Sequence, residues 1–318
     1  MATASATVAD ALAKFRAGET LAPPTPPIAP AAPAAPVKAG RTRRITYPRP
    51  NGEDYYAREV IGSDHDIDML RSSVGETTRK NLYCLLFGEP GVGKTGAAEA
   101  AFPELITLEG DGDTTVDDLV GMWVQNPDGT YEWVDGPLVE AAEQGTALLI
   151  DEIALIEPKV LAGSVYAAMD GRGRFRVKTN PKRGIITIKP GFTVIGSCNP
   201  NAPGARMSEA LLSRFSIHME YTTDYDLAKQ LGVPPKFIAV AKNLQTKKEN
   251  NNSRYVPQMR ELLAAKEATE RYGIDFAAAN FISTAPERDR PVVADVVSRQ
   301  FGTAIAPLRS GDAATAAI

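Results

Sequence analysis

Residues 88–95, which read Gly-Glu-Pro-Gly-Val-Gly-Lys-Thr, constrain the fold more than any other part of this chain. They follow the apolar run 82–87, which predicts a buried parallel strand. Glycines in such a loop let backbone N–H groups curl around phosphates, and Lys94 and the start of a helix add positive charge. The stretch therefore predicts a phosphate loop that binds a nucleoside triphosphate. The loop residues expected to contact the nucleotide are Glu89, Pro90, Gly91, Val92, Gly93, Lys94, Thr95 and Gly96.

Composition narrows the possible partners and the compartment. The net charge of -4 and the pI near 5.5 argue against general capture of nucleic acid or of an anionic membrane. The two cysteines, Cys84 and Cys198, lie in apolar runs, which favours reduced core thiols over a disulfide or a metal pair. No apolar run reaches the ~18 residues of a membrane helix, and the N-terminus lacks the pattern of a signal peptide. We expect a cytoplasmic protein.

Apolar runs alternate with helix-length stretches in the middle of the chain. The strand candidates are residues 82–87, 105–108, 147–150, 192–197 and 216–221. This alternation predicts a parallel sheet covered by helices. Residues 225–231, 235–245 and 257–272 then predict a small helical domain, with one more helix at 291–301. The expected division is a disordered Ala/Pro-rich tail at 1–45, a large α/β domain at 46–222, a helical lid at 223–285 and a C-terminal tail at 286–318.

Carboxylates follow the strand candidate at 147–150. We expect this strand to neighbour the loop strand, so that Asp151 and the hydroxyl of Thr95 hold Mg²⁺. Glu152 is then placed to polarise a water for in-line attack on the γ-phosphate. Asn199 ends the fourth strand candidate, at the sheet edge where parallel sheets bind ligands, and is placed to orient that water. Arg214, at the end of a short helix capped by Ser208, is expected to point toward a neighbouring subunit's nucleotide.

These residues resemble those of the AAA+ ATPases, specifically the helix-2-insert group that includes MoxR, CbbQ, NorQ and the dynein-type modules. The most specific piece is Asp-Asp-Leu-Val-Gly at 117–121, followed by Asp-Gly-Pro-Leu-Val-Glu-Ala at 135–141 and then the acidic strand. In that group the intervening segment is a hairpin that faces the ring pore. An Asp-Gly turn at 128–129 joins two alternating runs here, which supports a hairpin independently. Residues 175–177 and 185–188 resemble the second pore-side hairpin.

The resemblance also implies roles for individual residues. Arg214 resembles the arginine finger that acts in trans, and Asn199 resembles the first sensor. Arg260 resembles the second sensor, which reads the nucleotide from the lid, with Arg254 as the alternative. The residues Val60, Ile61 and Gly62 resemble the segment that lies against the adenine ring. The fold implied is an AAA+ five-stranded parallel sheet with helices on both faces and a small α-helical lid.

The function implied is an ATP-hydrolysing ring motor, expected to be a hexamer, that remodels or activates a protein client. Members of this group often pair with a protein that carries a von Willebrand A domain. One alternative is a nucleotide-dependent switch or scaffold that binds ATP without productive turnover. Another is a nucleic-acid motor or a restriction-type NTPase of the same group, which the low positive charge disfavours. ATP and Mg²⁺ are the expected cofactors.

Overall fold

The computed structural model describes residues 44–250 and 254–310. The expected tail at 1–45 therefore lies almost entirely outside the described residues. None of the helices in the described ranges combines the length and apolar character needed to cross a bilayer.

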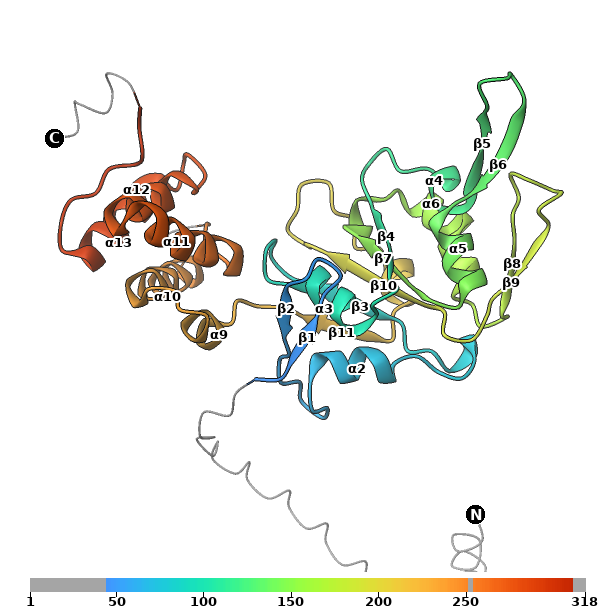
Figure 1. Ribbon diagram of the computed structural model, residues 1–318, viewed down its shortest axis with the longest axis horizontal. Helices are drawn as coiled ribbons and strands as arrows, with labels where there is room; N and C mark the ends of the chain where they lie inside the picture. Colours follow the sequence, from blue (N-terminus) through green and yellow to red (C-terminus); the bar gives the residue numbers. More distant parts are fainter. Residues whose placement is uncertain (1–43, 251–253, 311–318) are drawn as a thin grey trace, which may run out of the picture. The chain divides into compact units, whose positions relative to one another are not determined.

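A five-stranded parallel sheet forms the centre of the larger part (Figure 1). Its strands, in spatial order, are β11 (Ile217–Glu220), β3 (Cys84–Phe87), β10 (Thr193–Cys198), β7 (Ala147–Asp151) and β4 (Ile106–Glu109). Every neighbouring pair is parallel. All five strands were expected from their apolar runs, because strands buried on both faces have few polar positions. The expected pairing was wrong in one place, since β10 lies between β3 and β7.

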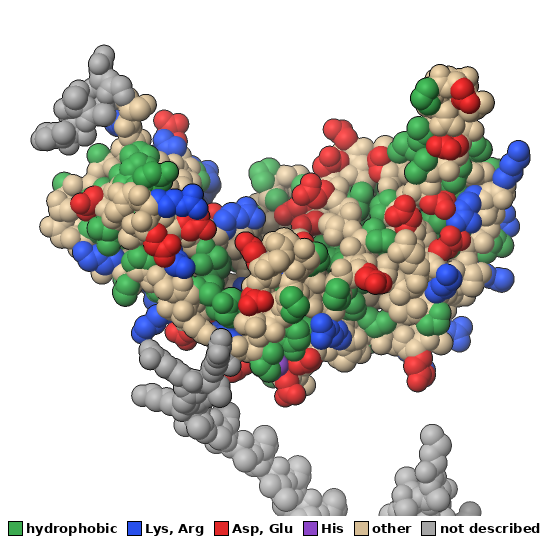
Figure 2. Space-filling view, in the orientation of Figure 1, with side chains coloured by type: hydrophobic (Ala, Val, Ile, Leu, Met, Phe, Trp, Pro, Cys, Tyr) green, Lys and Arg blue, Asp and Glu red, His purple; other side chains and the backbone are tan. Residues whose placement is uncertain are grey.

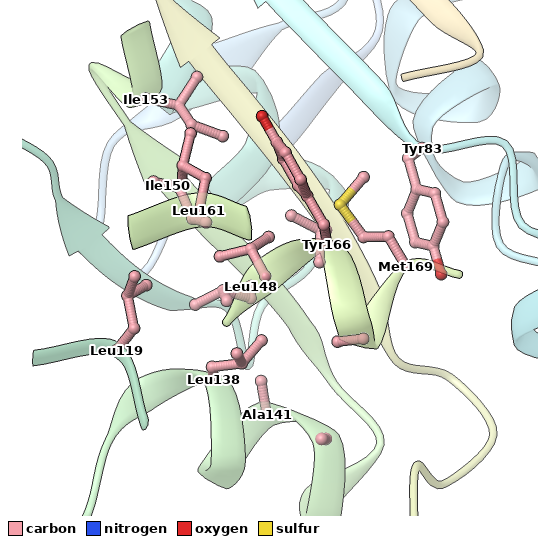
Figure 3. Packing of buried hydrophobic residues seen from close by; sticks show 14 of the residues in the cluster. Tyr83, Leu119, Leu138, Ala141, Leu148, Ile150, Ile153, Leu161, Tyr166 and Met169 are labelled. Atoms are coloured by element: carbon pink, nitrogen blue, oxygen red, sulfur yellow. The ribbon is translucent and has the colours of Figure 1, made fainter. Parts of the chain in front are cut away.

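Helices cover both faces of this sheet, as predicted. Alternate residues of the strands enter different apolar clusters: Leu85 and Leu148 face one side, whereas Leu86 and Leu149 face the other. The second cluster is covered by α2 (Asp66–Ser72) and α3 (Lys94–Ala101). The first is covered by α4 (Val116–Val120), α5 (Pro137–Gln144), α6 (Pro158–Gly163) and α7 (Val165–Ala168). Figure 3 shows side chains of these helices converging on β7.

Within the described residues, three two-stranded antiparallel sheets lie outside the central sheet. They are β1 (Thr46–Pro48) with β2 (Asp54–Tyr56), β5 (Gly121–Gln125) with β6 (Tyr131–Asp135), and β8 (Arg174–Arg176) with β9 (Ile185–Thr187). The second and third confirm the two expected hairpins. The first, β1–β2, was not expected. Its strands are only three residues long and carry no clear alternation. The short elements between strands are η1 (Thr78–Lys80), η2 (Ile153–Leu155) and α8 (Glu209–Leu212), the last capped by the Ser208 hydroxyl as expected.

The helical part has its own apolar cluster. Its helices are α9 (Tyr225–Gln230), α10 (Pro235–Glu249), α11 (Met259–Tyr272), α12 (Ile274–Ser283) and α13 (Arg290–Phe301). Val293 and Val297 of α13 are fully buried in this cluster beside Phe237 and Phe281. The expected lid boundary at residue 285 is therefore too early, because the sequence alone does not show which core an isolated helix joins.

Candidate functional site: a phosphate loop between the sheet and the helical part

The phosphate loop joins the carboxyl end of β3 to α3. Gly88 lies against β11: a Cβ there would come within 2.2 Å of the Tyr221 carbonyl oxygen, so a side chain has no room. Gly93 caps α3 with φ of 101°, a conformation that favours glycine. The loop ends where the positive end of the α3 dipole begins, as an anion site requires.

Lys94 is buried at this point, with 6% of its surface exposed. Its Nζ donates to the carbonyl oxygens of Gly88 (2.9 Å) and Glu89 (3.2 Å). Burial lowers the pKa of Lys94, and the charges of Glu152 and Asp151 counteract this effect. A phosphate anion beside the amino group would also favour the charged form of Lys94. The buried amino group is therefore suited to bind a phosphate.

Thr95 and Asp151 meet across the sheet even though β7 is not the neighbour of β3. The Thr95 hydroxyl donates to Asp151 Oδ2 over 2.8 Å, and the Ser197 hydroxyl of the intervening β10 donates to Asp151 Oδ1. Mg²⁺ prefers oxygen ligands and is commonly held by one or two protein groups together with water and phosphate. Thr95 Oγ1 and Asp151 Oδ2 fit this requirement as the protein groups of a Mg²⁺ site.

Glu152 has an unusual backbone conformation. Its φ is 48°, and among the described residues it alone combines a side chain with positive φ. Such conformations persist where the surrounding structure enforces them, and they occur often at functional sites. The Glu152 carboxylate accepts from the backbone N–H of Asn199 over 3.2 Å. One oxygen of Glu152 is therefore held by the residue that directly follows β10.

Asn199 is buried beside Glu152, but its side chain has another partner. Its Oδ1 accepts from the backbone N–H of Asn201 over 3.0 Å. The part of Asn199 that contacts the catalytic candidate is thus the main chain. Its role in orienting a water remains a prediction.

Arg260 of α11 lies directly on the phosphate loop. Its backbone N–H donates to the Gly91 carbonyl over 3.3 Å, and a Cβ on Gly91 would come within 2.8 Å of Arg260 Cβ. Arg254 instead donates its backbone N–H to Asp289 of the helical part. Of the two arginines considered from the sequence, Arg260 contacts the phosphate loop through its backbone, and its role as a second sensor stays a prediction.

A cavity of about 710 Å³ lies over the loop. Residues 90–96, Asp151, Glu152 and Arg260 line it together with apolar side chains of the helical part, Leu227, Leu231, Met259 and Leu263. Its walls combine phosphate-binding groups and an apolar surface, as a nucleotide requires.

Two sets of residues expected at the nucleotide lie outside this lining. Val60, Ile61 and Gly62 do not line it, because they form a tight turn in which Val60 bridges to Ser63 and Ile61 is fully exposed. The side chain of Glu89 also points elsewhere, since it forms an ion pair with Lys248 of α10 at 2.9 Å. Only its backbone belongs to the phosphate loop.

Sequence reasoning missed a buried network beside the loop. The Asp66 carboxylate, 1% exposed, accepts from the hydroxyls of Tyr55 and Tyr221 and from the backbone N–H groups of Arg58 and Ile67. Burial raises the pKa of both tyrosines, which keeps them as donors. An Asp in the first turn of a helix is usually exposed to solvent, and no local sequence signal indicated that Asp66 is buried.

The network holds Arg58 against the phosphate loop. The Arg58 guanidinium donates to the carbonyls of Val92 and Thr222 (3.0 Å for Thr222) and lies over the Tyr221 ring. Arg58, Tyr55 and Tyr56 all line the cavity. They therefore occupy one wall of the site, where the sequence had suggested Val60 and its neighbours.

Arg214 lies away from this cavity. Its side chain is exposed, and its guanidinium lies 5.2 Å from the centre of the Tyr166 ring. Arg214 is not among the residues that line the cavity.

Comparison with known proteins identifies the region that carries the site. Residues 83–215 match the family model of the AAA domain, dynein-related subfamily. This stretch is therefore similar to an AAA domain. The match covers β3 through α8 and so includes the phosphate loop, Asp151, Glu152 and Asn199.

Similar proteins extend the likeness over about half of the chain. Uncharacterized proteins of Staphylococcus aureus strain USA300 and strain bovine RF122 / ET3-1 are 36% and 35% identical over 162 residues. This is 48% of the present chain and 60% of each relative, so the match spans less than two thirds of the relatives' length. A crystal structure described as a "putative ATPase" from Cytophaga hutchinsonii aligns over 74% of both chains, with 15% identity and a TM-score of 0.39. At this score the likeness adds nothing to the fold already described.

Proposed function

We propose that this protein is an ATP-hydrolysing AAA+ motor of the MoxR type that remodels or activates a partner protein. The observation that carries the proposal is the contact between Thr95 and Asp151 at 2.8 Å, beside Lys94 and Glu152 at one phosphate loop. This arrangement supplies phosphate binding, two oxygen ligands for Mg²⁺ and a carboxylate that can act on water.

The residues divide the reaction among them. Lys94 and the loop N–H groups bind the phosphates, and Arg260 contacts the loop from the helical part. Glu152 polarises the attacking water, while its bond from the Asn199 N–H fixes the orientation of the carboxylate. Bound Mg²⁺ would offset the charge that develops on the transferring phosphate.

Two features support contacts with other proteins, and we propose a hexameric ring that acts on a client. Arg214 is exposed and does not line its own subunit's cavity, as expected of a residue that completes a neighbour's site. The β5–β6 hairpin exposes Met122, Trp123, Val124 and Tyr131 with fractions between 38% and 63%. Exposed apolar groups of this size favour contact with another protein, such as a client with a von Willebrand A domain.

A comparison of two variants tests the proposal. Lys94→Ala should abolish ATP binding, because it removes the buried charge that contacts the phosphates. Glu152→Gln should retain ATP binding and lose hydrolysis, because it removes only the group that polarises water. Binding is measured with a fluorescent ATP analogue and turnover by phosphate release.

Glu140→Gln is the matched control, since Glu140 is an exposed carboxylate on α5. It should leave binding and turnover unchanged. Equal loss of ATP binding in the Lys94 and Glu152 variants would contradict the division of roles. A wild-type protein that binds ATP without releasing phosphate would indicate a nucleotide-dependent switch.

A further inference from the structure

The β8–β9 hairpin has one buried and one exposed face. Its pairing extends beyond the strands, since the Val177 N–H donates to the Gly184 carbonyl and the Ile188 N–H to the Gly173 carbonyl, both at 2.9 Å. Side chains alternate between the faces. The inner residues are Phe175, Val177, Ile186 and Ile188, all buried in the large apolar cluster. The hairpin is thus anchored, and its outer face has a fixed orientation.

The outer face is strongly positive. Its cations are Arg174, Arg176, Lys178 and Lys189, which we call the cationic face. All four are exposed, and within residues 44–250 and 254–310 none of them forms an ion pair. Figure 2 shows Lys and Arg side chains gathered at the edge where Figure 1 places β8 and β9.

This concentration of charge contrasts with the rest of the molecule. The chain as a whole has a net charge of -4. Unpaired like charges on one short hairpin repel one another, and an anionic partner would relieve that repulsion. The cationic face therefore favours a partner that carries several negative charges.

We infer that the cationic face binds an extended acidic segment of the protein partner. Residues two apart on a strand lie about 6.6–6.8 Å from each other, and alternate side chains of an extended peptide have the same spacing. An acidic segment lying along β8 can therefore bring successive carboxylates opposite Arg174, Arg176 and Lys178. This inference rests on the proposed function, because it names the chemistry of the partner on which the motor acts.

The composition of the face favours a polypeptide over single-stranded nucleic acid. Proteins that bind single strands combine positive charge with aromatic side chains on which bases stack. Phe175, the aromatic residue of β8, is buried with 6% exposure. The uncharged outer residues are Ile185 and Thr187, which suit the side chains of a peptide and offer no surface for stacking.

The cationic face is also connected to the exposed β5–β6 hairpin. Arg183, in the loop between β8 and β9, forms an ion pair with Asp135 at 2.9 Å and with Glu143 at 2.6 Å. Asp135 in turn accepts from the Trp133 indole N–H over 2.7 Å. The loop of the β8–β9 hairpin is thus joined to the base of the β5–β6 hairpin. A partner with an acidic segment next to apolar side chains would match both surfaces.

Binding of a defined peptide tests the inference. The probe is a fluorescein-labelled alternating Glu-Thr peptide of about 12 residues, long enough to span the hairpin. Its anisotropy is measured with the full-length protein at two salt concentrations, about 0.05 and 0.2 M. The comparison probes are a Lys-Thr peptide and an oligothymidylate of equal length.

The test variant is Arg174→Glu with Arg176→Glu, and the matched control is Lys229→Glu with Arg271→Glu. Both pairs are exposed and change the net charge equally, but the control residues lie on α9 and α11. We expect the Glu-Thr peptide to bind the wild type and the control, and to bind the test variant at least about tenfold more weakly. Its affinity should also fall with added salt.

Three results would overturn the inference: no binding of the Glu-Thr peptide, equal weakening in both double variants, or tighter binding of the oligothymidylate. The last would assign the face to nucleic acid. Melting temperatures of the variants check that each is folded. Peptide binding needs no ATP hydrolysis. If the wild-type protein binds the peptide but does not hydrolyse ATP, the result would refute only the proposed motor function.

Discussion

Removal of the Asp66 carboxylate should destabilise the protein far more than its position on a short helix suggests. Asp66→Ala leaves four donors without their acceptor: the buried hydroxyls of Tyr55 and Tyr221, the buried N–H of Ile67 and the part-buried N–H of Arg58. Each unsatisfied buried group costs about 1–3 kcal/mol, and loss of a partner in a buried charged network typically costs about 3–5 kcal/mol in total. We adopt the total of about 3–5 kcal/mol, which is lower than a sum over the four groups, because some of these donors will bind water in the variant.

The assay is thermal unfolding of the full-length variant. For domains of this size 1 kcal/mol corresponds to about 2–4 °C, so the melting temperature should fall by roughly 6–20 °C. Arg58 should also lose its position on the phosphate loop, because its backbone N–H is held by Asp66. We therefore expect a weaker affinity for ATP in the folded variant.

Asp68→Ala is the matched control. Asp68 is on the first turn of the same helix, but its side chain is 46% exposed and forms an ion pair with His65. Both variants lose a carboxylate near the helix N-terminus, which contributes about 0.3–1 kcal/mol. If Asp66→Ala unfolds at the same temperature as Asp68→Ala, the network does not stabilise the fold. If its affinity for ATP is also unchanged, Asp66 does not position Arg58.

Other perturbations test separate parts of the molecule. Trp133→Ala should lower the free energy of unfolding by about 2–3 kcal/mol, because its ring packs on the large apolar cluster and its indole N–H donates to Asp135. Trp123→Ala should lower it by less than about 1.5 kcal/mol, the contribution of the contact between the two rings, and equal losses would contradict this assignment. Burial raises the pKa of the Cys84 and Cys198 thiols to about 11, so alkylation of the folded protein by iodoacetamide should stay slow at pH 8 and accelerate only toward pH 11. Because the folded state keeps these protons longer than the unfolded chain, their contribution to stability should fall as the pH rises from about 9 to 11, and rapid alkylation at pH 8 would refute the burial. Arg214→Ala subunits mixed with wild type should lower phosphate release by more than their fraction of the mixture, and a strictly proportional decrease would argue against action across a subunit boundary.

Local sequence patterns predicted most of the elements that carry the site. The five strands of the central sheet could be recognised because burial on both faces leaves short continuous apolar runs. The phosphate loop could be recognised because its glycines meet a backbone requirement within a few residues. The β5–β6 hairpin likewise followed from its Asp-Gly turn.

The order of the strands was decided only by tertiary structure. An apolar run records that a strand is buried but does not name its neighbours, so the insertion of β10 between β3 and β7 could not be predicted from spacing. The same holds for α13, whose buried valines would suit either core. The insertion has a consequence for the chemistry, because it brings the Ser197 hydroxyl to Asp151.

The chain by itself thus determined that a phosphate loop, an acidic strand end and the β5–β6 hairpin exist, since each is encoded within about fifteen residues. Tertiary structure decided which groups complete the site. Asp66 and Tyr221 are 155 positions apart, and their contact depends on how α2 and β11 pack around β3. Ile61, which the family resemblance placed at the nucleotide, is exposed on a turn instead. The difference is physical: backbone and burial preferences act locally, whereas a buried polar contact requires two distant segments to meet.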